Sequence, residues 1–292
     1  MRGIIFAGCS FTWGEGLELY SEYPTIRYSF YKQEHKGYYF PEAVMYQKPG
    51  HVRFIEANRF SRKVAQHFNT FDLVHPKNGG SLSTMRKFIA SSLLEYEGDI
   101  EYIVLQFTEV LRDVYIHDNC INDCCDISVR EILNDRVSYE CKELSLNDYS
   151  KYKSYELYNK FFSGKTPLEI DMEYSIKELV KTLRYLKNIT ETTDIKVKLL
   201  GSWTNDNQKY ENLKNVDLEL YQFYKQNLVP IETKKRTHET IFTAYNSEPE
   251  YRIATDLPWS NNDHPSLEFH NVLTKSIIKN IENDTEIKNN YI

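Results

Sequence analysis

The sequence has no apolar run long enough to cross a membrane, and its amino terminus enters a strand pattern without the signature of a signal peptide. It has no excess of positive charge either, since the formal net charge at pH 7 is −6, which gives no basic field for nucleic acid. We therefore expect a cytoplasmic protein that binds neither membranes nor nucleic acids. No internal repeat, low-complexity tract or linker is visible, so the 292 residues predict one domain.

The chain also lacks the Cys-x-x-Cys pairs that mark a structural zinc site. Four of its five cysteines nevertheless cluster with His117 in the middle of the chain: Cys120, Cys124, Cys125 and Cys141. We interpret them as reduced thiols and predict no bound metal.

The most informative stretch lies near the amino terminus, at residues 4–16. An apolar run from Ile4 to Ala7 is interrupted by Gly8 and followed by Cys9 and Ser10, which predicts a buried strand that ends in a tight turn. In open α/β sheets, ligands bind outside the carboxyl ends of the strands, so Ser10 is suited to chemistry there. The alternative is that Ser10 only caps a turn or helix.

Strand and helix patterns alternate along the rest of the chain, which predicts an α/β fold. The expected strands are at 71–75, 102–107, 196–200 and 228–231, and the expected helices are at 54–68, around 85–96, at 172–192, at 209–225 and from Pro265 onward. Three segments break the alternation: an aromatic insertion at 19–50, an acidic one at 113–172 and a polar, loop-like section at 232–262.

Two further strand ends carry groups of interest. Gly79 and Gly80 follow the second strand and precede a helix, where bare N–H groups can hold an anion, although backbone geometry alone also explains them. The third strand ends in Gln106-Phe107-Thr108-Glu109, with Arg112 just beyond. The carboxyl ends of three strands are therefore predicted to meet at one crevice.

Taken together, a serine after the first strand, a glycine turn after the second and a histidine before the last helix resemble the SGNH/GDSL hydrolase superfamily. The resemblance rests on Gly8-Cys9-Ser10-Phe11-Thr12, Gly79-Gly80-Ser81 and Asp263-His264-Pro265-Ser266. It implies a three-layer α/β/α sandwich with a five-stranded, mainly parallel, flavodoxin-like sheet. The α/β-hydrolase alternative requires Gly-x-Ser-x-Gly in mid-chain, and here Thr12 takes the last position near the amino terminus.

The resemblance also implies a mechanism without a cofactor, namely ester hydrolysis through an acyl-enzyme. Ser10 would be the nucleophile and His264 its general base, with Asp263 orienting the imidazole. The backbone N–H groups of Ser10 and Gly80 would hold the oxyanion.

The sequence departs from the superfamily in two blocks. The aspartate usual three positions before the histidine is Asn261 here, so Asp263, Asn261 or a main-chain carbonyl orients the ring, the last two leaving a Ser-His dyad. The usual Gly-x-Asn-Asp after the third strand is also absent, and Thr108, Gln106 or Arg112 would donate in place of its asparagine.

The substrate is expected to be a small-molecule or carbohydrate ester, most plausibly one that carries an O-acetyl group, because aromatic faces stack on sugar rings and the chain has 23 Tyr and 15 Phe. Two alternatives remain: an O-acyltransferase with the same acyl-enzyme, and a non-catalytic module that binds a glycan or a protein on the same fold.

Overall fold

The structure is a computed structural model. It describes residues 2–14, 16–17, 49–75, 81–108, 112–113, 127–128, 167–203, 207–251 and 264–289, and for Ser10 and a few other residues at element ends it describes the backbone alone. The insertion expected at 19–50 lies outside this part except for its last two residues. Of the insertion expected at 113–172, Asp113, the short strand β5 (Ile127–Ser128) and the start of a helix lie inside it.

Four parallel strands form the central sheet, in the order β2-β1-β3-β6. They are β1 (Gly3–Ala7), β2 (Asp72–Val74), β3 (Ile100–Gln106) and β6 (Lys196–Leu200). β1 is buried throughout and β3 nearly so, as their unbroken apolar runs predict for a parallel sheet covered on both faces. Because β1 lies between β2 and β3, the direction of winding reverses there, as in doubly wound α/β folds.

The fifth strand expected at 228–231 does not form in the described part of the chain. Leu228 makes one isolated parallel bridge to Leu199, and the Val229 N–H donates to the Leu199 carbonyl at 2.8 Å. Pro230 then has no N–H with which to continue the ladder. The chain turns instead into an antiparallel hairpin of β7 (Ile231–Glu232) and β8 (Thr237–His238).

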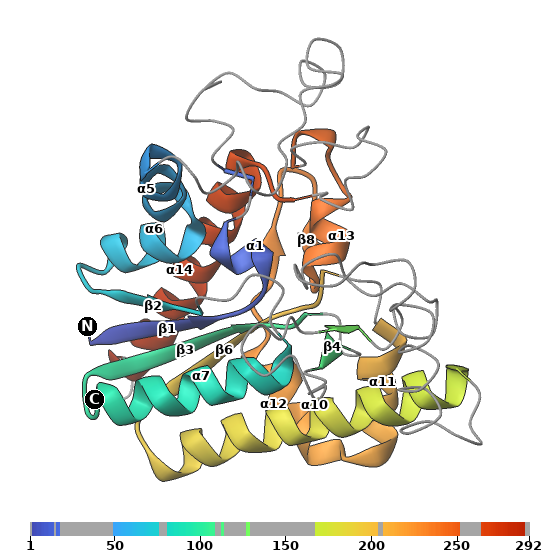
Figure 1. Ribbon diagram of the computed structural model, residues 1–292. Coiled ribbons are helices and arrows are strands. Elements are labelled where there is room, and N and C mark those ends of the chain that lie inside the picture. Colours follow the sequence, from blue (N-terminus) through green and yellow to red (C-terminus); the bar gives the residue numbers. More distant parts are fainter. Residues whose placement is uncertain are drawn as a thin grey trace, which may run out of the picture.

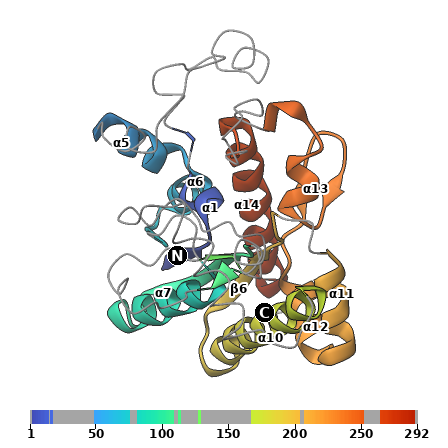
Figure 2. The same cartoon turned by 45° about the vertical axis from the view of Figure 1, so that its right-hand side comes forward.

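Helices cover both faces of the sheet, which gives the described part three layers (Figures 1 and 2). On one side lie α5 (Pro49–Asn58), α6 (Phe60–His67) and α14 (Leu267–Asn289), and on the other lie α7 (Leu82–Glu95), α10 (Pro167–Thr192), α11 (Asn207–Val216) and α12 (Leu218–Asn227). Phe6 of β1 packs edge-on against Phe60 of α6, with ring centroids 5.9 Å apart.

Two of the predicted helices are each divided in two. The helix expected at 54–68 is interrupted at Arg59, whose ψ of 148° is extended. The helix expected at 209–225 is interrupted at Asp217, whose carboxylate accepts the N–H of Leu220 at 3.0 Å and so caps α12.

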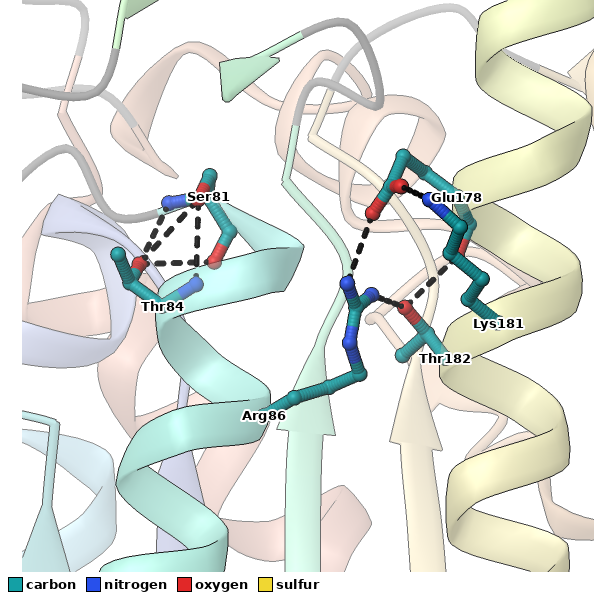
Figure 3. Close-up of polar contacts among 6 residues, drawn as sticks. All are labelled: Ser81, Thr84, Arg86, Glu178, Lys181 and Thr182. Atoms are coloured by element: carbon teal, nitrogen blue, oxygen red, sulfur yellow. Dashed lines mark hydrogen bonds and ion pairs between the residues drawn. The ribbon is translucent and has the colours of Figure 1, made fainter. Parts of the chain in front are cut away.

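The start of α7 is fixed by a capping box at Ser81 and Thr84. Ser81 accepts the Thr84 N–H at 3.2 Å, while the Thr84 hydroxyl accepts the Ser81 N–H at 3.0 Å. Further along α7, Arg86 reaches across to α10, where it contacts Glu178 at 3.0 Å and the Thr182 hydroxyl at 2.6 Å (Figure 3). These contacts hold α7 against α10 beneath the sheet.

Candidate active site

The carboxyl ends of β1, β3 and β6 meet at one edge of the sheet. β1 runs through Gly8 and Cys9 into the short helix α1 (Ser10–Trp13), of which Ser10 is the first residue. Thr108 follows β3, and Trp203 follows β6. This edge includes the reversal point between β1 and β3, which is where open α/β sheets bind ligands.

The turn before Ser10 needs a glycine. The N–H groups of Thr12 and Trp13 both donate to the Cys9 carbonyl at 3.0 Å, so the chain coils immediately after β1. A Cβ atom on Gly8 would lie 1.9 Å from the Thr12 hydroxyl oxygen and 2.9 Å from Oε1 of Gln106. Gly8 therefore lets α1 begin against the end of β3.

Gln106 supports this turn from the neighbouring strand. Its Oε1 accepts the Thr12 hydroxyl at 2.6 Å, and its Nε2 donates to Cys9 Sγ at 3.3 Å. All three side chains are buried. Gln106 thus binds the residues that flank Ser10 and Phe11, and one of its two amide hydrogens is used for this purpose.

His75 supports the same turn from β2, and the sequence analysis gave it no role. Its Nδ1 lies 3.1 Å from the Gly8 carbonyl oxygen, which only accepts, so this nitrogen carries the proton. The ring is buried and packs edge-on against Phe88 of α7. A histidine directly after an apolar strand at the same sheet edge is the signal that could have indicated it.

His264 lies next to α1, although 253 residues separate it from Phe11. The imidazole and the Phe11 ring are tilted at 57° with centroids 5.6 Å apart, and His264 is 7% exposed. Phe11 directly follows Ser10, whose side chain lies outside the described part. The structure therefore brings His264 beside the segment 8–12, which contains Ser10.

The position of His264 is fixed by the start of α14. Ser266 caps this helix by accepting the Phe269 N–H at 3.2 Å, and its own N–H and hydroxyl donate to the carbonyls of Tyr251 and Glu250 at 2.9 and 2.6 Å. The helix thus begins at Leu267, and our expectation of Pro265 as its first residue was wrong by two positions.

The section expected to be loop-like, 232–262, is partly regular. Besides the β7–β8 hairpin it forms α13 (Ile241–Tyr245) and a 3-10 turn, η1 (Pro249–Tyr251). Tyr245 at the end of α13 donates its hydroxyl to the His264 carbonyl at 3.2 Å, and its ring lies 5.6 Å from that of Phe11. The polar composition concealed the few apolar residues of this segment that are buried.

Trp203 completes the cluster of rings around Phe11. The two rings are 5.4 Å apart and tilted at 33°, and the indole N–H donates to the Thr108 hydroxyl at 3.4 Å. Thr108 is fully buried, and its carbonyl accepts the Ser202 hydroxyl at 3.5 Å. Thr108 and His264 therefore lie on the same edge, joined through contacts with Phe11 and Trp203.

Three predicted site residues lie outside the described part: Gly80, Asn261 and Asp263. His117 and the cysteines at 120, 124, 125 and 141, which we interpret as reduced thiols, also lie outside it. Arg112 is described by its backbone in β4 (Arg112–Asp113) alone. Where side chains are described, no group of three or more metal-ligating residues is found, and none of the helices has the length and apolar character to cross a membrane.

Comparison of the chain with protein-family models, with curated proteins and with solved structures finds no match.

Proposed function

We propose that this chain is a serine esterase of the SGNH type, which removes a small acyl group through a covalent intermediate on Ser10. In this proposal His264 is the general base, and the Ser10 and Gly80 N–H groups with the Thr108 hydroxyl are the oxyanion donors. Asp263 or Asn261 orients the imidazole. The proposal is supported by the parallel sheet and by the contact of His264 with Phe11, the residue after Ser10.

The observation that carries the proposal is the contact between the Phe11 and His264 rings at 5.6 Å. A serine hydroxyl attacks esters efficiently only when a neighbouring base takes its proton. His264 is far from Ser10 in the sequence, so the fold has to bring the two segments together for it to be that base. The doubly wound strand order supports the same reading, because Ser10 follows the strand at the reversal point.

In the first half of the reaction, the Ser10 oxygen adds to the ester carbonyl and its proton passes to His264. The negative charge on the carbonyl oxygen is stabilised by the oxyanion donors. When the intermediate collapses, the bond to the alcohol breaks and the alcohol leaves with the proton from His264. Water then repeats the sequence on the acyl-enzyme and releases the acid.

The substrate that fits best is an acyl ester of a carbohydrate, with acetyl as the acyl group. The support is the aromatic character of the edge, where Phe11, Trp203 and Tyr245 gather, with Trp203 only partly buried. Phe11 and Tyr245 are buried, so Trp203 is the ring of this cluster that is accessible for stacking on a sugar face. A panel of nitrophenyl esters of increasing chain length, beside acetylated oligosaccharides, tests this, and turnover of long acyl chains alone would contradict it.

Covalent labelling with a fluorophosphonate tests the esterase proposal itself. We expect the wild type and Ser91→Ala to be labelled alike, since Ser91 is an exposed serine on α7 that donates to the Phe88 carbonyl. Ser10→Ala should abolish labelling. Absence of labelling in folded wild-type protein would contradict the proposal and favour the non-catalytic binding module, while acetyl transfer to a sugar faster than hydrolysis would identify an acyltransferase.

A further inference from the structure

We propose that Trp203 is a positioning residue that turns the hydroxyl proton of Thr108 toward the oxyanion, an inference that rests on the proposed esterase function. The sequence analysis gave Trp203 no role.

The hydrogen-bonding capacity of the two groups carries this inference. An indole N–H only donates, so the Thr108 oxygen must be the acceptor in their 3.4 Å contact. A threonine hydroxyl has one proton and rotates freely about its C–O bond. By occupying a lone pair, Trp203 excludes every rotamer in which that proton points at the indole.

The proton of Thr108 has no acceptor among the described residues, although the side chain is fully buried. A buried donor without an acceptor is costly unless something that binds there supplies one. A developing oxyanion is such an acceptor, and it would bind most strongly to a donor that is already oriented.

The position of Trp203 agrees with this role. It follows β6, contacts Thr108 at the end of β3, and packs against Phe11 beside Ser10. Trp203 therefore contacts both Thr108 at the end of β3 and Phe11 in the helix α1. Its Phe11 contact fixes the indole plane and hence the direction of the N–H.

A double-mutant cycle on the rate of phosphonylation at saturating fluorophosphonate tests the inference. Thr108→Val removes the hydroxyl at nearly constant shape and should slow the reaction about 100-fold, whereas Thr108→Ser should largely retain it. Trp203→Phe keeps a ring against Phe11 but loses the N–H, and should slow the reaction about fivefold to tenfold with little change in the concentration for half-saturation. In the Thr108→Val background the tryptophan substitution should have no further effect.

Effects that multiply in the double variant would overturn the inference and leave the esterase proposal standing. A wild type that does not react at Ser10 would instead remove the esterase proposal, and the inference with it. A second measurement serves if Trp203→Phe does not fold: the indole N–H resonance of Trp203 should shift upfield and exchange faster in Thr108→Val. An unchanged resonance would show that the hydrogen bond is absent and would overturn the inference.

Discussion

His264 and His270 lie six residues apart, His264 just before α14 and His270 in its first turn, in very different surroundings. His264 borders the sheet edge, beside the ring of Phe11. His270 is fully buried between α14 and α6, where its ring stacks on Phe60 and its Nδ1 accepts the Phe60 N–H at 3.2 Å. Nε2 of His270 must then carry the proton, and no hydrogen-bond partner for it is found in the described part.

The difference shows how burial decides what an imidazole does. Desolvation lowers the pKa of His270 to about 3, assisted by the positive charges of Lys63 and Arg59. A base of this kind stays neutral at physiological pH and cannot take a proton from a serine. The residue type and its proximity to a helix start are shared by both histidines, so only their environments separate a candidate base from a structural residue.

Replacing each histidine with glutamine tests most directly whether His264, and not His270, acts as the base. His264→Gln should slow phosphonylation and ester hydrolysis by about 10²- to 10⁴-fold, because general-base catalysis is lost. His270→Gln keeps an acceptor for the Phe60 N–H and should stay within about threefold of the wild type. Rates measured with folded protein decide the matter, and equal losses for the two variants would contradict the assignment of the base.

A second comparison sets the tightly packed turn before Ser10 against Gly50, an open position in the first turn of α5. Gly8→Ala places a Cβ 1.9 Å from the Thr12 hydroxyl oxygen and should lower the free energy of unfolding by about 1–3 kcal/mol, with loss of Ser10 labelling. Gly50→Ala is the control, since no atom lies within 4 Å and alanine favours a helix by up to about 1 kcal/mol. Urea unfolding measures both, and a Gly8→Ala protein as stable as the wild type would show that the turn is not tightly packed.

The smallest expected effect concerns pH and His270. Because its pKa falls from 6.5 in the unfolded chain to about 3 in the fold, the unfolded state binds more protons between these pH values, and stability falls as the pH drops below 6.5. The loss at pH 5 relative to pH 7 should be about 2 kcal/mol.

His270→Gln should lack this part of the pH dependence. His67→Gln, which replaces an exposed histidine paired with Glu282, should retain it. Parallel slopes for wild type and His270→Gln between pH 7 and 5 would show that His270 is protonated in the folded protein.

Much of the fold was predictable because its signals are local. The apolar runs of β1 and β3 need no distant information, and Lys196–Leu200 was predicted at its observed bounds. Helix breaks were harder: Arg59 and Asp217 interrupt patterns that continue on both sides, and capping by Asp217 depends on backbone angles. The expected fifth strand does not extend past Val229 because Pro230 has no N–H to donate. Its apolar neighbours led us to predict a strand there in spite of the proline.

The candidate site residues at the ends of strands and helices were predictable from the sequence. The residues that pack around them were not. Gly8, Thr108 and His264 stand at element ends that the sequence marks. The roles of His75, Tyr245 and Trp203 depend on which ring packs against which, and no spacing rule encodes contacts between residues so far apart. The roles of Gly80, Asn261 and Asp263 remain predictions.

Local signals suffice to predict an α/β chain whose first strand ends at a glycine, because hydrophobic periodicity and the conformational freedom of glycine act over a few residues. The packing of Trp203, Tyr245 and His264 around Phe11 is visible only in the folded chain. That arrangement depends on strand order and on α13, and it arises from burying side chains brought together from four distant segments of the chain.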